Sequence, residues 1–235
     1  MAMSDRFFAR LRGVCGDEWA GYTEHTFIKQ LAAGSLPEEC FRHYLIQDYL
    51  FLIHFARAYA LAAYKSDNLE DIRAASRSVS AIVDTETSLH INYCKGWGLG
   101  EDDLMSAPES RATMAYTSYV LEKGASGDLL DLHVALAPCV VGYGEIAAGL
   151  KADPETATEN NPYAGWIEIY AGENYQAVAG AEIELLDRLS RRRGGNEYFL
   201  WRRRRFFERD FPVAAAFRTV ELALALAVRQ IAAHT

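Results

Sequence analysis

The chain has 235 residues, of which half are apolar, and a formal net charge of −8 at pH 7. A chain of this length can bury a sizeable core. The acidic balance argues against a general nucleic-acid-binding protein, which needs a basic face for the phosphates. The first residues lack the apolar core of a signal peptide, and no apolar run approaches membrane-spanning length. We therefore expect a cytoplasmic protein with no membrane partner.

The four cysteines show no paired spacing of the kind that binds a metal ion: Cys15, Cys40, Cys94 and Cys139. Far-apart cysteines in a protein without an export signal are typical of reduced thiols. The sequence thus gives no sign of a disulfide framework or of a zinc site.

Helical periodicity runs through the whole chain, and no segment alternates as a strand would. The pattern predicts an all-α fold in one domain, with no internal repeat or linker. A first helix is expected over residues 4–24, weakened by its glycines, and a short one over 27–32. Ser35 and Glu38 have the spacing of a capping box with a proline between them, which predicts the start of a helix reaching about Tyr64.

This helix has a core face at steps of three and four residues, made by Phe41, Tyr44, Asp48, Leu52, Phe55, Tyr59 and Ala62. Asp48 therefore occupies a position where the pattern calls for an apolar residue. A carboxylate there costs several kcal/mol unless it is paired or hydrogen-bonded. Asp48 is either a structural acid bound by a tyrosine or a functional residue.

Asn68 is expected to cap the next helix, which runs to about Tyr93. Its inward positions are Ile72, Val79, Ile82, Val83 and Leu89. Glu86 and His90 lie one turn apart near this face, a spacing that can place two ligands on one metal ion. A hydrogen-bonded structural pair is the alternative. A second capping box, from Ser106 to Glu109, predicts a further helix that carries Tyr116 and ends at Gly124.

The stretch from Asp128 to Lys151 is apolar nearly all round, which predicts a buried helix. Asp128 is a suitable N-cap. Pro138 lacks an N–H and should kink the helix.

Cys139 follows the kink directly, with Tyr143 one turn further on the same face. Gly142 and Gly144 should leave room beside them, so the segment has the features of a pocket wall. The alternative is a structural cysteine, because free cysteine is among the most buried residue types.

The remaining segments are also helical in pattern. A short helix is expected around Trp166 to Tyr170, and an amphipathic one from about Glu173 to Arg192. A last helical region starts at Glu197 and breaks at Pro212.

Five segments resemble the TenA family, the thiaminase II type of aminopyrimidine aminohydrolase, in the same order along the chain. They are FRHYLIQDYLFLIHFARAYA (41–60), TETSLH (85–90), AYTSY (115–119), ALAPCVVGYGE (135–145) and WIEIYAGENY (166–175). The resemblance runs from about Trp19 to Phe211. It implies one haem-oxygenase-like helical domain over residues 1–235, with 212–235 as a divergent tail, assembled as a homotetramer.

The resemblance also implies an activity. Members hydrolyse 4-amino-5-aminomethyl-2-methylpyrimidine to the 5-hydroxymethyl compound and ammonia, which salvages the pyrimidine half of degraded thiamin. Many also cleave thiamin itself. No metal ion or organic cofactor is required, so the expected partner is an aminopyrimidine or thiamin.

The same resemblance assigns roles to individual residues. It makes Cys139 the nucleophile and Asp48 the carboxylate that holds the aminopyrimidine edge. Tyr116, Tyr143 and Tyr170 match pocket tyrosines that contact the substrate. Glu208 matches the proton-donating acid, so we expect Asp48 and Glu208 to face Cys139 across one pocket.

Two positions depart from the family pattern. Phe51 stands where the family usually has a tyrosine whose hydroxyl lies close to the cysteine. Pro212 replaces a tryptophan of the motif that carries the acid, and the tail beyond it follows the family poorly. Glu221 is therefore a rival to Glu208.

Two other functions compete with this one. A haem-oxygenase-like metal oxidase would use Glu86 and His90, but it needs more carboxylates and a second histidine. A pyrimidine-binding or regulatory protein would need no catalysis. The presence of Cys139 together with Asp48 argues against a mere binder, which needs no nucleophile.

Overall fold

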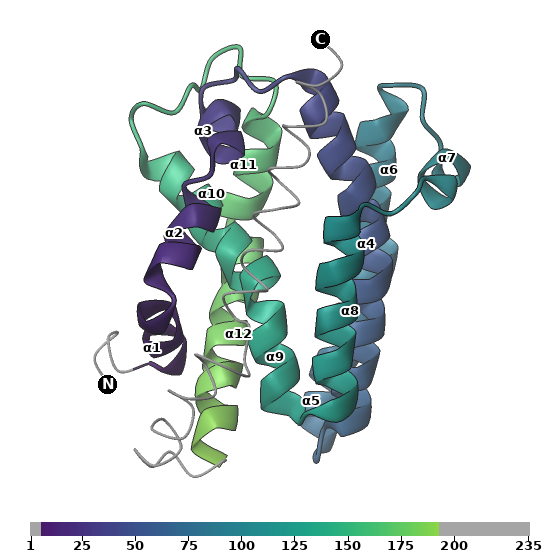
Figure 1. Cartoon of the computed structure of the whole chain (residues 1–235), viewed down its shortest axis with the longest axis vertical. Helices are drawn as coiled ribbons and strands as arrows, with labels where there is room; N and C mark the ends of the chain where they lie inside the picture. Colours follow the sequence, from purple (N-terminus) through teal and green to yellow (C-terminus); the bar gives the residue numbers. More distant parts are fainter. Residues whose placement is uncertain (1–5, 193–235) are drawn as a thin grey trace. The chain divides into compact units, whose positions relative to one another are not determined.

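The computed structural model describes residues 6–192. About 81 % of them are helical, and none forms a strand. They divide into two compact units: residues 6–36 and 133–192 form the first, and residues 37–132 form the second (Figure 1). The predicted all-α class is confirmed for the described part of the chain. The assignment of residues 1–235 to a single domain stays a prediction.

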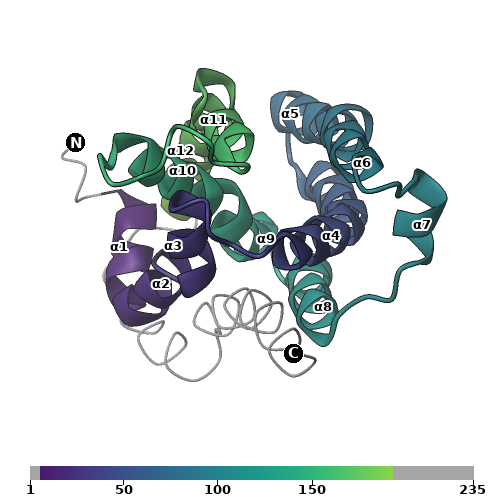
Figure 2. The ribbon, with the colours of Figure 1, turned by 90° about the horizontal axis from the view of Figure 1, so that it is seen from above.

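The second unit is built on one long helix, α4, which spans Glu38–Lys65. The other elements of the unit are α5 (Leu69–Ser80), η2 (Ala81–Glu86), α6 (Thr87–Lys95), α7 (Glu101–Ser106) and α8 (Arg111–Ser126). All five pack against α4, and Figure 2 shows α5, α6 and α8 gathered around it. At the far end of α4, Lys65 Nζ donates a 2.7 Å hydrogen bond to the carbonyl oxygen of Gly127.

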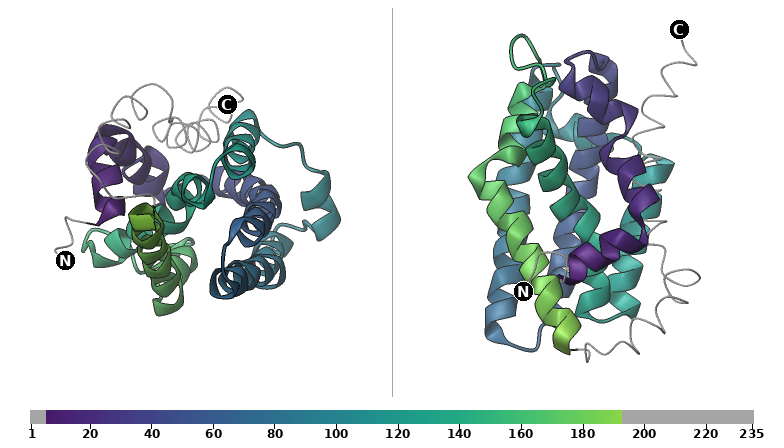
Figure 3. Two further views of the ribbon diagram at one scale, coloured as in Figure 1. Left: turned by 90° about the horizontal axis from the view of Figure 1, so that it is seen from below. Right: turned by 90° about the vertical axis from the view of Figure 1, so that its left-hand side faces the viewer.

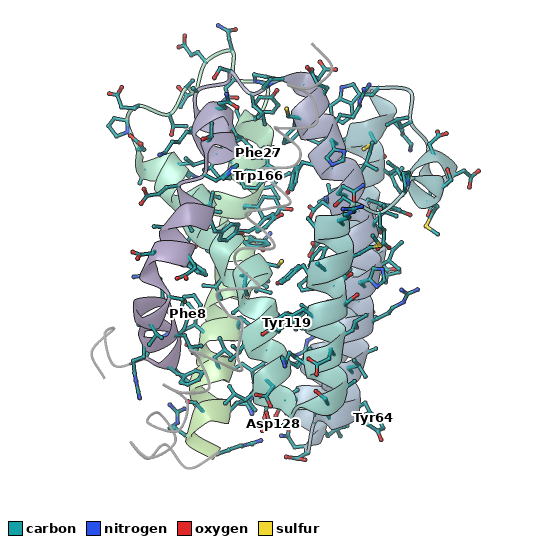
Figure 4. All side chains as sticks on the ribbon, in the orientation of Figure 1. Phe8, Phe27, Tyr64, Tyr119, Asp128 and Trp166 are labelled. Atoms are coloured by element: carbon teal, nitrogen blue, oxygen red, sulfur yellow. The ribbon has the colours of Figure 1, made fainter. Side chains whose placement is uncertain are left out.

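The predicted apolar face of α4 is confirmed. Its buried members are Phe41, Tyr44, Leu52, Phe55, Tyr59 and Ala62. Burying a large apolar side chain contributes about 1.5–3 kcal/mol, so this one face supplies much of the stability of the unit. On another face of the helix, Tyr64 is 85 % exposed and points outward (Figure 4).

The helix starts show which capping signals hold. Asn68 caps α5 as predicted, since its side-chain oxygen accepts a 2.9 Å hydrogen bond from the Asp71 N–H. The two predicted capping boxes are wrong: α4 begins after Pro37, and α8 is capped by Ser110, whose hydroxyl accepts from the Thr113 N–H. Both boxes placed a residue that precedes proline in the first helical position, and such a residue is disfavoured in the helical region.

The first unit contains the remaining helices. They are α1 (Phe7–Val14), α2 (Gly16–Thr23), α3 (Thr26–Ala32), η3 (Pro138–Gly142), α10 (Tyr143–Ala152), α11 (Ala164–Ala171) and α12 (Glu173–Arg192). The helix α9 (Leu129–Ala137) leads into the unit from the last residues of the second. Helix α12, yellow-green in Figure 3, packs against α1, η3, α10 and α11. It is therefore the support on which the η3 turn rests.

The predicted first helix is in two pieces. Its described part breaks at Cys15, whose backbone leaves the helical region at φ −121° and ψ 40°. Gly13 and Gly16 flank this residue, and glycines are weak helix formers. Asp187 of α12 accepts a 2.6 Å hydrogen bond from the Phe7 N–H, which ties the start of α1 to α12.

Within residues 6–192, the apolar stretch from Asp128 corrects the expectation that no run approaches membrane-spanning length. Leu129–Ala152 forms one continuous helical segment that is long and apolar enough to cross a membrane. However, 83 % of its apolar window is buried inside the protein, as in a core helix. Asp128 caps it as predicted, accepting a hydrogen bond from the Asp131 N–H.

Candidate active site

Asp48 sits on the buried side of α4, where its carboxylate is hydrogen-bonded by two side chains. The Tyr44 hydroxyl donates to Asp48 Oδ2 at 3.1 Å, and His90 Nε2 lies 2.8 Å from the same oxygen. The Asp48 side chain is only 10 % exposed. A polar group in this position has to be hydrogen-bonded, and this one is. The tyrosine was foreseen as a partner of Asp48, but the histidine was not.

His90 is held from both sides of its ring. Its Nδ1 lies 2.8 Å from the main-chain carbonyl oxygen of Glu86, which can only accept, so Nδ1 carries a proton. Burial lowers the pKa of His90, but the hydrogen bond to Asp48 and the negative charges of Asp48 and Glu86 outweigh it, so the pKa is raised. With Nδ1 engaged by the Glu86 carbonyl, the other ring nitrogen, Nε2, is directed at the Asp48 carboxyl group.

Glu86 is the second acid of this cluster. Burial of its carboxyl raises its pKa to about 7, with a further contribution from the negative charge of Asp48, while the positive charge of His90 opposes the shift. The predicted alternative of a hydrogen-bonded Glu86–His90 pair is thus realised through the main chain of Glu86. Within residues 6–192 there is no group of three or more side chains that could hold a metal ion.

The segment before His90 does not continue α5 as a regular helix. Ala81–Glu86 is a π-helix, in which each hydrogen bond spans five residues instead of the four of an α-helix. Of the predicted inward residues here, Ile82 is buried, but Val83 and Leu89 are 53 % and 43 % exposed. The prediction for Val83 and Leu89 is wrong because the wider turn shifts which residues face the core.

Phe51 and Tyr116 lie together in the second unit. Their rings are stacked with centroids 5.7 Å apart and an interplanar angle of 18°. Phe51 also contacts Phe55, at 5.1 Å between centroids. Phe51 is half-buried, so it presents an aromatic surface three residues along α4 from Asp48.

Cys139 lies in the first unit, in the π-helical segment Pro138–Gly142. The kink predicted at Pro138 therefore takes the form of a widened turn, because proline has no N–H to continue the α-helical pattern. Cys139 is half-buried, whereas the other three cysteines are buried. Burial raises the pKa of Cys15 to about 12 and that of Cys94 to about 11. Among the four cysteines, Cys139 is the one that is not buried.

Two tyrosine hydroxyls fix the main chain of this turn. The Tyr22 hydroxyl donates to the carbonyl oxygen of Pro138 at 3.2 Å, and the Tyr175 hydroxyl donates to that of Cys139 at 3.0 Å. Hydrogen bonds to carbonyls of a non-regular turn replace part of the missing helical pairing. The position of the Cys139 backbone is thus set by side chains from α2 and α12.

The glycines that follow Cys139 do not leave open room, as the sequence suggested. A Cβ on Gly142 would lie 2.6 Å from Cε1 of Tyr22, and one on Gly144 would lie 3.1 Å from Cβ of Ala179. Both positions are occupied by neighbouring side chains. Gly142 instead allows Tyr22 close enough to bond the turn, which is a packing role for a glycine.

Tyr143 and Tyr170, two of the predicted substrate tyrosines, are in contact. Their ring centroids are 5.1 Å apart at an angle of 64°. Trp166, labelled in Figure 4, lies 4.7 Å from Tyr170, and Tyr175 lies at the same distance on an edge-to-face geometry. Trp166 and Tyr175 were not predicted as site residues, although both lie in the WIEIYAGENY segment. Tyr175 joins this aromatic cluster to the Cys139 turn.

The predicted residues are thus distributed over the two units. Cys139, Tyr143 and Tyr170 belong to the first, and Asp48 and the stacked Phe51 and Tyr116 belong to the second. Both candidate acids, Glu208 and Glu221, lie outside the described residues.

Comparison with known proteins gives these positions a context. Residues 16–198 match the model of the TENA/THI-4/PQQC family. The chain belongs to this family. An aminopyrimidine aminohydrolase from Halalkalibacterium halodurans is 36 % identical over 168 residues, which cover 72 % of this chain and 74 % of that protein. The relatives with this name confirm the prediction that this family member is an enzyme, a hydrolase.

Two solved structures complete the comparison. A TenA family transcription regulator from Silicibacter sp. TM1040 is 42 % identical, with a TM-score of 0.78 and coverage of 97 % of this chain and 96 % of that one. A protein of unknown function with a heme oxygenase-like fold from Shewanella denitrificans is 16 % identical, has a TM-score of 0.67 and covers 95 % and 93 %. The predicted haem-oxygenase-like fold of this TenA family member is confirmed.

Proposed function

We propose that the chain is an aminopyrimidine aminohydrolase of thiamin salvage. It hydrolyses 4-amino-5-aminomethyl-2-methylpyrimidine to the 5-hydroxymethyl pyrimidine and ammonia, with Cys139 as the nucleophile. The observation that carries the proposal is the state of Cys139. This thiol matches the family's nucleophile, lies on a widened turn held by two tyrosines, and is the one cysteine of the four that is not buried.

The chemistry suits a cysteine. The thiolate adds to a carbon of the electron-poor pyrimidine ring, and the electron pair displaced into the ring then expels the amine from the exocyclic methylene. The leaving amine takes a proton and departs as ammonia. Water adds to the exocyclic alkene that remains, and loss of the thiolate restores the aromatic ring and the free enzyme. Substrate and water are consumed, and the alcohol and ammonia are produced.

Three further roles follow from this scheme. Asp48 binds the aminopyrimidine edge, since a carboxylate accepts strong hydrogen bonds from an exocyclic amino group. The aromatic rings of Tyr143 and Tyr170 bind the faces of the pyrimidine. Glu208 donates the proton to the leaving amine, with Glu221 as its rival.

The direct test is an ammonia-release assay with the purified protein and the aminomethylpyrimidine. We expect equal amounts of ammonia and hydroxymethylpyrimidine, and none with the Cys139→Ser variant. Thiamin in parallel reactions, with release of its thiazole alcohol as the readout, decides whether thiamin is also a substrate. A folded wild-type protein that releases neither product would contradict the proposal.

A second candidate, a non-catalytic pyrimidine-binding regulator, is favoured by the description of the Silicibacter relative as a transcription regulator. Ammonia release, measured before and after alkylation of Cys139, separates the two functions. We expect iodoacetamide to modify Cys139 before the buried Cys15, Cys40 and Cys94, and the aminomethylpyrimidine to protect it. An aminohydrolase would release ammonia and lose this activity when Cys139 is alkylated. A regulator would bind the pyrimidine and release no ammonia before or after alkylation.

A further inference from the structure

Two hydrogen bonds from different elements reach the same oxygen of the Asp48 carboxylate. Tyr44 reaches Oδ2 from the preceding turn of α4, and His90 reaches it from α6. A bond from a helix's own preceding turn and one from a neighbouring helix approach from different directions. Together they define the plane of the carboxylate as well as its position.

Both ring nitrogens of His90 are within hydrogen-bond distance of a partner. The Glu86 carbonyl oxygen holds Nδ1, so Nε2 is aimed at Asp48, and the side chain is only 6 % exposed. His90 lies in α6, one turn after the π-helical segment Ala81–Glu86, a type of turn that is frequent at functional sites.

We propose that His90 is a positioning residue for substrate binding: it holds the Asp48 carboxylate in the orientation that accepts the aminopyrimidine edge. The proposal rests on the proposed function, in which Asp48 binds that edge. His90 does not touch the substrate in this scheme and takes no part in the bonds that form and break.

The physical basis of the proposal is that the hydrogen bonds between a carboxylate and an aminopyrimidine edge depend on direction. An aminopyrimidine presents an amino N–H next to a ring nitrogen, so a carboxyl group recognises it well only when its plane is fixed. The contact between His90 and Asp48 is a short charge-assisted hydrogen bond, a type about twice as strong as a neutral one. Removing the His90 ring leaves a nearly buried carboxyl group without one of its hydrogen-bond partners, and the free energy of orienting it must then come from substrate binding.

The same unit contains a matched control. His54, also on α4, lies with Nε2 2.9 Å from Glu109 Oε1, so it makes a histidine–carboxylate pair of nearly the same length, although its Nδ1 faces Arg57 Nη1 at 3.2 Å instead of a carbonyl oxygen. Neither partner belongs to the predicted site, and the His54 side chain is 20 % exposed. His54→Gln therefore reports what the loss of such a pair costs when no substrate-binding group is involved.

The experiment compares wild type, His90→Gln, His54→Gln, Asp48→Asn and the double variant His90→Gln/Asp48→Asn in the ammonia-release assay. We expect His90→Gln to raise KM about tenfold, the scale of one charge-assisted hydrogen bond, and to change kcat by less than about threefold. His54→Gln should stay near wild type. The double variant should match Asp48→Asn, because a residue that acts only through Asp48 adds nothing once Asp48 is altered.

The outcomes separate this proposal from the function on which it rests. If wild type releases no ammonia, the proposed function fails. If wild type is active and His90→Gln keeps the wild-type KM, or if the two substitutions are additive, His90 is structural. KM does not depend on the concentration of folded enzyme, so partial unfolding cannot imitate the effect. Should His90→Gln fail to fold, His90→Asn replaces it in the assay, and a wild-type KM in that folded variant would overturn the proposal.

Discussion

The two π-helical segments, η2 at Ala81–Glu86 and η3 at Pro138–Gly142, solve different problems with the same irregularity. Most of η3 is buried, and its carbonyls accept hydrogen bonds from Tyr22 and Tyr175. In η2 only Ile82 is buried. The main chain of η3 is thus held by side chains of other helices at Cys139. The effect of η2 is instead on the direction in which the residues after it point.

This difference shows what each turn contributes. The η3 segment fixes the main chain of Cys139, so its effect is on the position of a single thiol. The η2 segment changes the phase of the helix, so that His90 faces the Asp48 carboxylate while Val83 and Leu89 turn outward. One turn places an atom of the candidate nucleophile, and the other selects which face of a helix meets the core.

Cys139→Ser replaces the thiol that lies in η3 and should have the largest effect of the substitutions. A hydroxyl without a neighbouring base is a poor nucleophile, so turnover should fall by a factor on the order of a thousand or more. Circular dichroism and aminopyrimidine binding should stay near wild type. Ammonia release by this variant at a rate similar to wild type would rule out Cys139 as the nucleophile.

Asp48→Asn tests the group that the second turn serves. The variant loses the carboxylate acceptor and alters the hydrogen-bond partner of His90, so we expect KM to rise by about ten- to a hundredfold, with a smaller fall in kcat. Steady-state ammonia release measures both parameters. A fall in kcat alone would place Asp48 in the chemical step rather than in binding.

Tyr175→Phe sharpens the comparison because it removes one external bond to η3 and keeps the ring in the aromatic cluster. Loss of a hydrogen bond of ordinary strength should lower kcat about three- to tenfold while KM changes little. Alkylation of Cys139 should slow in parallel, since the thiol is less well placed. If the substitution changes neither rate, the backbone of η3 is held without Tyr175.

The substitution Phe51→Tyr probes the departure from the family pattern and should have the smallest effect. A hydroxyl on this half-buried ring restores a group that the family uses near its cysteine, so turnover should rise by up to about tenfold, or ~1.4 kcal/mol of barrier. The stacking with Tyr116 should survive, which thermal unfolding can check. An unchanged or lower turnover in the folded variant would indicate a site already adapted to phenylalanine.

Much of the fold could be predicted from the sequence, because long amphipathic helices carry a regular signal. The face of α4 shows this, including Asp48 as an acid in an apolar position. The irregular turn at η3 matches the kink expected at Pro138, since proline removes a hydrogen-bond donor. For η2 no residue type marks the extra residue in the turn, so the inward residues after Ile82 were assigned wrongly.

The site was predictable only in part. A single residue could be recognised by its odd position, as with Asp48, or by its place in a family motif, as with Cys139 and Tyr170. Its partners from distant parts of the chain could not, because hydrogen bonds such as His90 to Asp48 and Tyr175 to Cys139 join residues 42 and 36 positions apart. Such pairs depend on tertiary packing, which the local pattern does not contain.

The phase shift in η2 has a consequence for insertions and deletions. A π-turn is an α-helix with one residue too many, so deletion of a single residue within Ala81–Glu86 offers the helix a regular path. The shortened helix would bring its apolar side chains back toward the core and gain stability, while His90 would rotate away from Asp48. The extra residue would then lower the stability of this helix while it directs His90 toward Asp48.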